Sequence, residues 1–424
     1  PLKNLVMGLL KKIGLLATTI ALCTLNSHHL HAQLSFDLNT ITTAVPFLMI
    51  TPESRGGGMG EVGVATEADA NSLHWNAAKL AFAEKNVGIS ISYTPWLRSL
   101  VPDIDLAYLS FYKKITKNKR IDQAFSGSLR FFSLGEIQFT DAAGNNTVQI
   151  RPSEYQLTAG YARQLSDRWS GGLALSFINS NLTGGQNVGN ADSSPGRSVA
   201  ADISAYYQND DVELWGLEST VAFGISIHNV GAKINYTNTD TRDFLPMNLR
   251  LGPRVTFNLD EYNTLTVAAD INKLLVPTPP VFALDSNGQP IPDGNSFVIA
   301  DGRDPNRSVA SGLFGSFTDA PRGFSEELEE INWGIGAEYW YAKQFAARAG
   351  FFWEHANKGN RKFFTLGAGL RYNVFGLDFA FLIPARIGNS NLTQDSPLAN
   401  TLRFTLTFDF EAFRNQDSEE PATN

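Results

Sequence analysis

The sequence predicts an all-β membrane protein, a 14-stranded antiparallel outer-membrane β-barrel with a small N-terminal plug segment. Three observations lead to this prediction. Fourteen segments after residue 86 alternate apolar and polar residues with the two-residue period of a β-strand. The connections between them alternate between long and short, and an apolar leader precedes them all. An even number of strands, with short turns at one end and long loops at the other, is the pattern of outer-membrane barrels.

The composition agrees with a β-rich membrane protein. Hydrophobic residues make up 43% of the 424 residues, and charged residues make up 18%. Soluble domains usually carry about 25% charged residues. Glycine (36) and phenylalanine (29) are abundant, which suits strands and turns better than helices. The net charge of −8 argues against nucleic acid as a partner, because the binding of phosphates needs an excess of Lys and Arg.

Residues 1–32 have the features of a signal peptide. Lys3, Lys11 and Lys12 give a basic start, and Ile13–Leu25 is an apolar run that is too short to span a bilayer. We expect cleavage after Ala32, which would also remove the single cysteine. No later segment has 18 uninterrupted apolar residues, so we expect no transmembrane helix.

The expected plug occupies residues 33–85. Residues 54–60 form a glycine-rich turn, and residues 61–83 carry Ala, Asn and Asp with short helical patterning. A 14-stranded barrel is wide enough to need a filling, and this segment is the natural one. The barrel then extends over residues 86–413, and residues 414–424 form a polar tail that we expect to be disordered.

The expected strands can be followed in order along the chain. They lie near residues 86–95, 103–114, 122–133, 153–164, 168–180, 198–208, 219–230, 247–259, 262–273, 331–343, 345–356, 361–374, 376–387 and 400–411. The last one shows the pattern clearly, since Leu402, Phe404 and Leu406 alternate with Arg403 and Thr405. We expect short turns at 209–218 and 375–376, and the longest loop at 274–330.

The two faces of these strands differ in polarity. In a soluble sandwich the apolar face would form the core, whereas in a membrane barrel it meets lipid and the charges meet the lumen. Strand lengths, loop asymmetry, the leader and aromatic residues near strand ends favour the barrel. Those aromatic residues are Trp96, Trp169, Trp340, Tyr341, Trp353 and Phe413. The charges expected in the lumen, as mutual ion pairs, are Arg250, Arg254, Asp270, Glu338, Arg348, Glu354, Arg371, Asp378, Arg403 and Asp409.

The ninth strand delivers the chain to the longest loop, and prolines stop it. Proline cannot donate a hydrogen bond to a sheet, so we expect a rigid ledge at the barrel rim. This ledge is the candidate partner-binding segment, and it comprises Lys273, Leu274, Leu275, Val276, Pro277, Thr278, Pro279 and Pro280. The acidic run Glu326–Glu330, at the end of the same loop, is expected to be solvated.

No motif predicts a catalytic site or a cofactor. Gly58, Gly60 and Gly63 match a dinucleotide fingerprint, but no βαβ unit surrounds them, so we interpret them as a flexible turn of the plug. The three histidines outside the leader are scattered, which argues against a histidine metal cluster. Calcium in the long loop stays open, although turn formation explains its polar residues more simply. Those residues are Asp285, Asn287, Asp293, Asp301 and Asp304.

Two segments resemble a known family. Residues 46–83, PFLMITPESRGGGMGEVGVATEADANSLHWNAAKLAFA, and residues 270–280, DINKLLVPTPP, resemble the PorV (LptO) family. That family belongs to the type IX secretion system of Bacteroidetes and is similar in turn to the FadL-like long-chain fatty-acid transporters. The plug residues that carry the resemblance are Arg55, Gly58, Met59, Gly60, Gly63, Ala65, Asp69, Ala70, Trp75 and Asn76. Residues 77–79 read Ala-Ala-Lys, where the wider superfamily commonly has Pro-Ala-Gly.

The resemblance implies a non-enzymatic role in protein transport. Such a protein binds the C-terminal signal domain of cargo that emerges from the SprA (Sov) translocon barrel. It then shuttles the cargo to the PorU sortase, which attaches it to lipopolysaccharide. The implied location is the Gram-negative outer membrane, with long loops extracellular and both termini periplasmic. The alternatives are a FadL-like channel for hydrophobic small molecules and a lipopolysaccharide deacylase.

Overall fold

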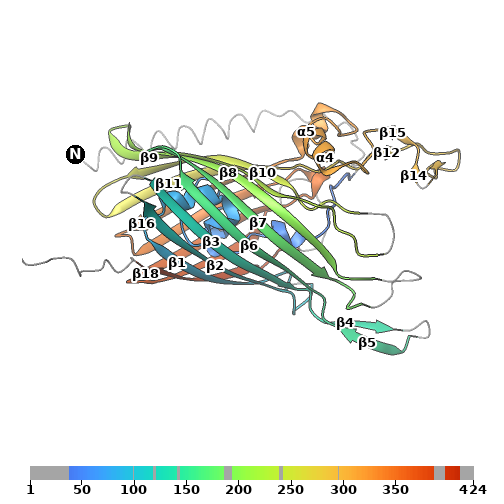
Figure 1. The fold of residues 1–424 in the computed structure, drawn as a ribbon, viewed down its shortest axis with the longest axis horizontal. Coiled ribbons are helices and arrows are strands. Elements are labelled where there is room, and N and C mark those ends of the chain that lie inside the picture. Colours follow the sequence, from blue (N-terminus) through green and yellow to red (C-terminus); the bar gives the residue numbers. More distant parts are fainter. Residues whose placement is uncertain are drawn as a thin grey trace, which may run out of the picture. The chain divides into compact units, whose positions relative to one another are not determined.

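The computed structural model describes residues 38–98, 100–117, 121–140, 144–185, 193–237, 242–294, 296–385 and 397–410. Fourteen antiparallel strands form a closed barrel, because the first strand pairs with the last (Figure 1). The predicted 14-stranded barrel with its N-terminal plug segment is therefore confirmed. The expected signal peptide at 1–32 and the tail at 414–424 lie outside the described residues.

The observed barrel strands match the expected ones closely. They are β1 (Val87–Pro95), β2 (Asp105–Lys117), β3 (Ile121–Ser133), β6 (Ser153–Gln164), β7 (Trp169–Asn181), β8 (Gly196–Leu214), β9 (Leu217–Gly231), β10 (Asn248–Asn258), β11 (Asn263–Leu274), β16 (Ile331–Tyr341), β17 (Phe345–Trp353), β18 (Lys362–Tyr372), β19 (Phe375–Pro384) and β20 (Leu402–Phe410). Each strand is hydrogen-bonded to its neighbour along the chain. The alternation of apolar and polar residues with a period of two was therefore sufficient to locate the barrel strands.

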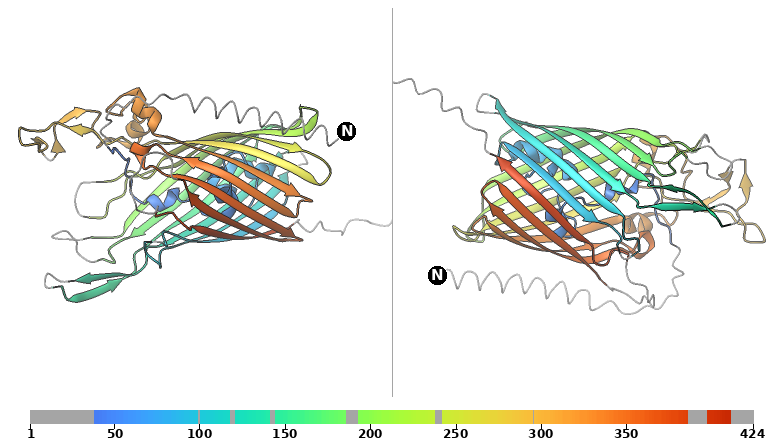
Figure 2. Two further views of the ribbon diagram at one scale, coloured as in Figure 1. Left: turned by 180° about the vertical axis from the view of Figure 1, so that it is seen from behind. Right: turned by 90° about the horizontal axis from the view of Figure 1, so that it is seen from below.

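Shorter elements occupy the connections and the lumen. The connections contain β4 (Ile137–Thr140), β5 (Asn146–Ile150), β12 (Val281–Phe282), β13 (Pro292–Asp293), β14 (Ser296–Phe297), β15 (Ile299–Asp301), α4 (Val309–Gly315), α5 (Phe324–Glu329) and the 3-10 helix η3 (Ala356–Lys358). The N-terminal segment contains η1 (Pro46–Met49), α2 (Ser54–Gly58), α3 (Ser72–Trp75) and η2 (Ala77–Phe82). Figure 2 shows these N-terminal helices inside the barrel.

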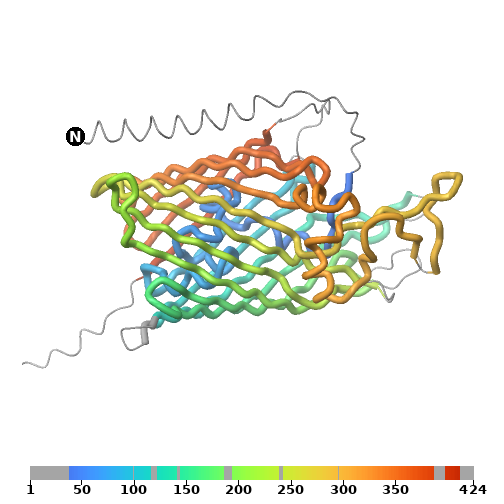
Figure 3. The backbone as a smooth tube through the Cα atoms, turned by 90° about the horizontal axis from the view of Figure 1, so that it is seen from above, coloured from blue at the N-terminus to red at the C-terminus, as the bar shows by residue number. Residues whose placement is uncertain are grey.

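Long and short connections alternate around the barrel, and the long ones gather at one end (Figure 3). Two short turns lie at other residues than those expected. The turn after β8 is only Trp215 and Gly216, both with positive φ, which suits a two-residue hairpin. The acidic pair Asp210 and Asp211 lies within β8 at a register irregularity between Asn209 and Val212, and the strand continues beyond it. The other turn, expected at residues 375–376, lies between β18 and β19 at residues 373–374.

The side chains divide as they do in a membrane barrel. On β11, Val267 and Ile271 are 38% and 44% exposed, whereas Thr266 and Asp270 are 2% and 0% exposed. The outward rows of the other strands are also apolar and exposed, so the barrel exterior suits lipid. Trp96 and Trp340 lie near strand ends but pack inward. The Trp340 ring faces the guanidinium groups of Arg348 and Arg371, and Trp96 packs against a buried apolar cluster. Among the described residues, no helix has the length and hydrophobicity needed to cross a membrane.

The described ends of the chain lie at opposite ends of the barrel. The backbone N–H of Asn39 donates to the carbonyl oxygen of Asn357, which belongs to a connection at the long-loop end. At the other end of the barrel, Phe410 pairs with Val87, where β1 begins. The expected periplasmic position of both termini concerns residues outside the described ranges. The chain enters the lumen from the long-loop rim and leaves it at the short-turn rim.

Because Val267 faces outward, a charged side chain at this position should destabilise the barrel in the membrane. Val267→Arg should impair barrel assembly by roughly 2–4 kcal/mol, because the guanidinium would face the apolar membrane interior. Val267→Leu is the matched control and should assemble normally. The yield of heat-resistant barrel after refolding into lipid measures the difference. Equal yields for the two variants would contradict the outward assignment. Thr266 is no control, because its side chain is buried on the lumenal face and its hydroxyl is hydrogen-bonded to that of Thr256.

Candidate functional site

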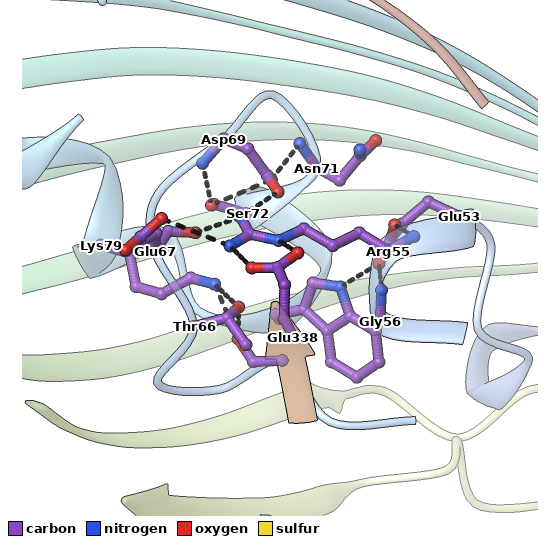
Figure 4. A network of polar contacts seen from close by, with 12 residues as sticks. Glu53, Arg55, Gly56, Thr66, Glu67, Asp69, Asn71, Ser72, Lys79 and Glu338 are labelled. Carbon is purple, nitrogen blue, oxygen red and sulfur yellow. Dashed lines mark hydrogen bonds and ion pairs between the residues drawn. The ribbon is translucent and has the colours of Figure 1, made fainter. Parts of the chain in front are cut away.

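The N-terminal helices are fastened to the barrel wall by a chain of buried ion pairs that we call the plug lock (Arg55, Glu338, Arg348, Asp378 and Arg371). Arg55 follows the start of α2 and grips Glu338 of β16 with two hydrogen bonds, Nη2 to Oε1 at 2.7 Å and Nε to Oε2 at 3.0 Å (Figure 4). Glu338 is fully buried. A bidentate pair of this kind holds its two partners in one orientation.

The plug lock continues sideways across four wall strands. Glu338 Oε2 also accepts from Arg348 Nε at 2.6 Å, and these residues face each other across β16 and β17. Arg348 Nη1 then reaches Asp378 Oδ1 at 2.7 Å, and Asp378 Oδ2 receives Arg371 Nη2 at 2.7 Å. Cations and carboxylates therefore alternate along the chain, so each buried charge has an opposite neighbour.

Within the plug, two carboxylates organise the backbone near Arg55. Glu53 caps α2 by accepting from the backbone N–H groups of Arg55 and Gly56, and it also accepts from the indole N–H of Trp75 at 3.0 Å. Asp69 Oδ2 lies 3.2 Å from Arg55 Nη1, and its Oδ1 accepts from the backbone N–H of Asn71 (Figure 4). These contacts make α2, α3 and the intervening loop one hydrogen-bonded unit.

A second group of contacts joins the plug to β11, the neighbour of β16 in the wall, and to β8 further round the barrel. Asp270 of β11 accepts from the backbone N–H groups of Gly63 and Val64 at 2.8 and 2.9 Å. Asn76 donates to the carbonyl oxygens of Val64 and of Ala205 on β8 at 3.1 and 3.0 Å. Lys79 is fully buried and donates to Gly63 and Thr66, so it fastens the plug internally.

The Gly-Met-Gly sequence at 58–60 lies directly against the wall, and wall glycines make this possible. Gly60 has a φ of +73°, and a Cβ built on it would lie 2.6 Å from the backbone nitrogen of Phe351. A Cβ on Gly350 would in turn lie 2.2 Å from the nitrogen of Gly60. The motif is therefore a turn of the plug, as expected, but it is packed against backbone and has no room to be a flexible one.

A separate buried cluster, the loop anchor (Lys273, Lys358, Glu326, Glu327 and Glu330), ties α5 to the rim. Lys273 Nζ donates to Glu327 and Glu330 at 2.9 and 2.6 Å. Lys358 Nζ donates to Glu326 and Glu330 at 2.6 and 3.1 Å. The expectation that residues 326–330 are solvated is wrong, because these three glutamates are 1–5% exposed. A lysine from β11 and another from η3 neutralise the acidic run.

Glu326 of the loop anchor and the neighbouring Asp319 differ in how readily they ionise. Burial alone would raise the pKa of Glu326, but the hydrogen bonds from Lys358 and from the backbone N–H of Arg322 lower it below its usual value. Burial raises the pKa of Asp319 to about 6, although Arg307 opposes this shift. The loop anchor therefore keeps Glu326 charged, whereas Asp319 is protonated more readily than an ordinary aspartate.

The proline segment follows β11 at the barrel rim, and most of its side chains are buried. Leu275 and Val276 are each 1% exposed and Thr278 is fully buried, with its hydroxyl 2.6 Å from Glu330. The segment forms the buried base of the loop and exposes few side chains that a partner could contact. The exposed apolar side chains of this loop lie further along, in the hairpins, in or just after α4, and on α5: Val281, Leu284, Ile291, Phe297, Val298, Phe314, Phe317, Phe324 and Leu328. Their exposure could not be inferred from the sequence, because the pattern of these short strands is too brief.

The polar loop residues form turns. Asp285 accepts from the backbone N–H groups of Asn287 and Gln289, and Asp304 accepts from that of Asn306. Across the described residues, no group of three or more His, Cys, Asp or Glu side chains is placed to hold a metal ion. In the lumen, His228 lies beside Asp202 and the carbonyl oxygen of Trp75, and His74 lies beside Arg130. These histidine contacts are part of the polar packing of the plug.

A closed barrel with an apolar exterior, a charged lumen and a plug locked from within defines the class of plugged outer-membrane β-barrels. The family model "Type IX secretion system protein PorV" matches residues 33–281, and the chain belongs to this family. It is a component of the type IX secretion system. A comparison of the sequence with curated proteins found no match.

Solved structures with a similar fold are distant in sequence. A Pseudomonas aeruginosa FadL homologue is 14% identical, with a TM-score of 0.40, and the match covers 85% of this chain and 99% of that one. The Ralstonia pickettii toluene transporter TbuX is 11% identical, with a TM-score of 0.43 and coverage of 89% and 100%. The P. putida toluene transporter TodX is 11% identical, with a TM-score of 0.44 and coverage of 88% and 100%.

The plug lock predicts unequal effects for two glutamates that both contact Arg55. Glu338→Gln should destabilise the plug by about 3–5 kcal/mol, because two buried guanidinium groups lose their shared carboxylate. Glu67→Gln should cost less, about 0–1 kcal/mol, because the Glu67 side chain is half exposed, so that solvent screens its contacts with Arg55 at 3.5 Å and with Arg254 at 3.1 Å. Protease access to residues 46–83 in the folded barrel measures the release of the plug. Equal access in both variants would contradict a central role for Glu338.

The loop anchor predicts a local effect on α5. Lys273→Met should speed amide hydrogen exchange in residues 324–330 by on the order of a hundredfold, since breaking a buried ion pair costs about 3 kcal/mol or more. Arg303→Met is the control, because Arg303 is exposed in the same loop. Unchanged exchange in the Lys273 variant would show that other contacts hold α5 in place.

Proposed function

We propose that this protein binds the C-terminal signal domains of cargo proteins as they leave the SprA (Sov) translocon barrel and carries them to the PorU sortase. It does so without catalysis, and its long connections face the cell exterior. The β20 end then faces the periplasm, and the chain near Asn39 lies at the extracellular rim. Membership of the PorV family supports the secretion role.

The observation that carries this proposal is the locked plug. Two cavities of about 30 and 20 Å3 lie between the plug and the lumenal wall, and polar and charged residues dominate their linings. Small-molecule sites generally occupy about 300–1,000 Å3 and have mainly apolar linings. A barrel filled in this way acts through its rim and outer surface, so a channel for hydrophobic molecules has less support.

A deacylase has less support as well, because such an enzyme needs a nucleophile activated by a base. The hydrogen bonds of His74 and His228 go to Arg130, Asp202 and the carbonyl oxygen of Trp75. None of these partners is a hydroxyl or thiol nucleophile. The lumenal histidines therefore act as packed polar groups.

The rim offers an apolar surface of the kind that binds proteins. Leu284 and Ile291 are 59% and 37% exposed in the hairpin region of the long loop, and Phe314 of α4 is 77% exposed. Clustered apolar side chains on a polar rim mark interaction surfaces. Val309 and Leu313 of α4 pack against a buried cluster that includes Leu275 and Val276, and this gives α4 a fixed base. We therefore place the cargo contact on residues 281–317, beyond the proline segment.

The proposal predicts a selective loss of cargo capture. The double variant Leu284→Ser/Ile291→Ser should bind a purified type IX C-terminal signal domain about tenfold more weakly, or by roughly 1.4 kcal/mol. Ile137→Ser/Val148→Ser is the matched control, because these two exposed residues belong to the β4–β5 hairpin. Binding of detergent-solubilised barrel to the immobilised signal domain is the measurement. Unchanged binding in the first variant, or equal loss in both, would overturn the assigned surface.

A further inference from the structure

A groove lies on the outside of the barrel, between α5 and the wall. Its volume is about 200 Å3, and it is lined by Leu249, Leu251, Ile271, Lys273, Phe317, Phe324, Glu327, Leu328 and Ile331. The loop anchor holds α5 over this part of the wall through Lys273. The groove is therefore fixed in place by buried ion pairs.

The floor of the groove belongs to the lipid-facing surface. Leu249 and Leu251 continue the outward row of β10, and Ile271 continues the outward row of β11 above Val267. Strand side chains two residues apart point to the same face, so these residues share the face that meets the bilayer. The apolar membrane band thus runs without interruption into the groove.

The roof of the groove is the apolar side of α5. Phe324 and Leu328 are four residues apart, on one side of the helix, and are 75% and 51% exposed. Glu326 and Glu330 lie on the side that meets Lys358. This short helix therefore turns its charges to the rim and leaves apolar side chains uncovered beside the membrane.

The lining offers no free charge for a polar ligand. Its two charged residues, Lys273 and Glu327, are bonded to each other at 2.9 Å. Apolar cavities of about 150 Å3 stay dry and accept hydrocarbon ligands. A hydrocarbon chain therefore suits the groove, and a hydrated or charged group does not.

We propose that the groove holds one acyl chain of a bilayer lipid, which inserts between α5 and the outer faces of β10, β11 and β16. The continuity of the floor with the membrane band identifies the bilayer as the source. The paired charges make the site indifferent to the headgroup. This role is separate from cargo binding and does not depend on it.

The test uses the full barrel in nanodiscs made with phosphatidylglycerol that carries a diazirine in the middle of one acyl chain. After irradiation, mass spectrometry should find adducts on Phe317, Phe324 or Leu328, as well as on the outward faces of β11 and β16. Leu328→Arg should lower the α5 adducts by about tenfold, since it places a charge in an apolar groove. Phe314→Arg is the matched control, because Phe314 is exposed on α4 outside the groove.

Three readouts keep the test decisive. Unchanged hydrogen exchange in α5 shows that the helix remains docked in Leu328→Arg, and wall adducts show that the barrel sits in the bilayer. Phosphatidylcholine with the same diazirine should give equal labelling of α5. The proposal is overturned by wall adducts without α5 adducts, by undiminished adducts in Leu328→Arg, or by labelling with one headgroup only. A cross-link between α5 and a second copy of the chain would assign the groove to dimer contact instead.

Discussion

The structure depends on the contact between Arg55 and Glu338. A barrel of 14 strands encloses more space than its own side chains fill, so the lumen needs a plug of fixed position. Glu338 is buried between Arg55 of the plug and Arg348 of the wall. A buried carboxylate without a cation would strongly destabilise the folded protein. The contact with Arg55 gives Glu338 a cationic partner, and the same contact fixes the plug against the wall.

Buried ion pairs also hold the long loop in place. Lys273 belongs to the outward row of β11, where a charge facing lipid would be unfavourable. The glutamates of α5 cover it, so the lysine is paired and the helix is held at the rim. The apolar side of α5 is then left beside the membrane. Lys273, at the end of β11, thus fixes the position of α5, and the position of α5 in turn forms the groove on the exterior.

The sequence was enough to predict the strands, because an outward apolar and an inward polar row repeat with period two. It also identified the set of lumenal charges, for example Glu338, Arg348 and Asp378. It did not give their partners, since pairing depends on the register of neighbouring strands and on residues almost 300 positions away, as for Arg55. The acidic run at 326–330 was misassigned for the same reason. Its lysine partners come from β11 and η3, 28 to 57 residues distant.

The path of the N-terminal segment could not be predicted either. Asn39 reaches the long-loop rim through hydrogen bonds with Pro279, Glu326 and Asn357, and no local pattern indicates such contacts. The glycines of the plug gave a correct family resemblance, yet their physical role became visible only beside Gly350 and the other wall glycines. The close approach of two backbone segments depends on how they pack together. It produces no periodic pattern in the sequence of either segment.

The central claim is that the plug closes the lumen, so that the protein works through its rim and surface. Conductance of the purified barrel in a planar lipid bilayer tests this most directly. The ion pairs and backbone contacts between plug and wall predict an electrically silent barrel, without steady single-channel steps at moderate voltage. Stable, voltage-independent steps from the wild-type protein would mean that a continuous aqueous path passes the plug, and they would contradict the account.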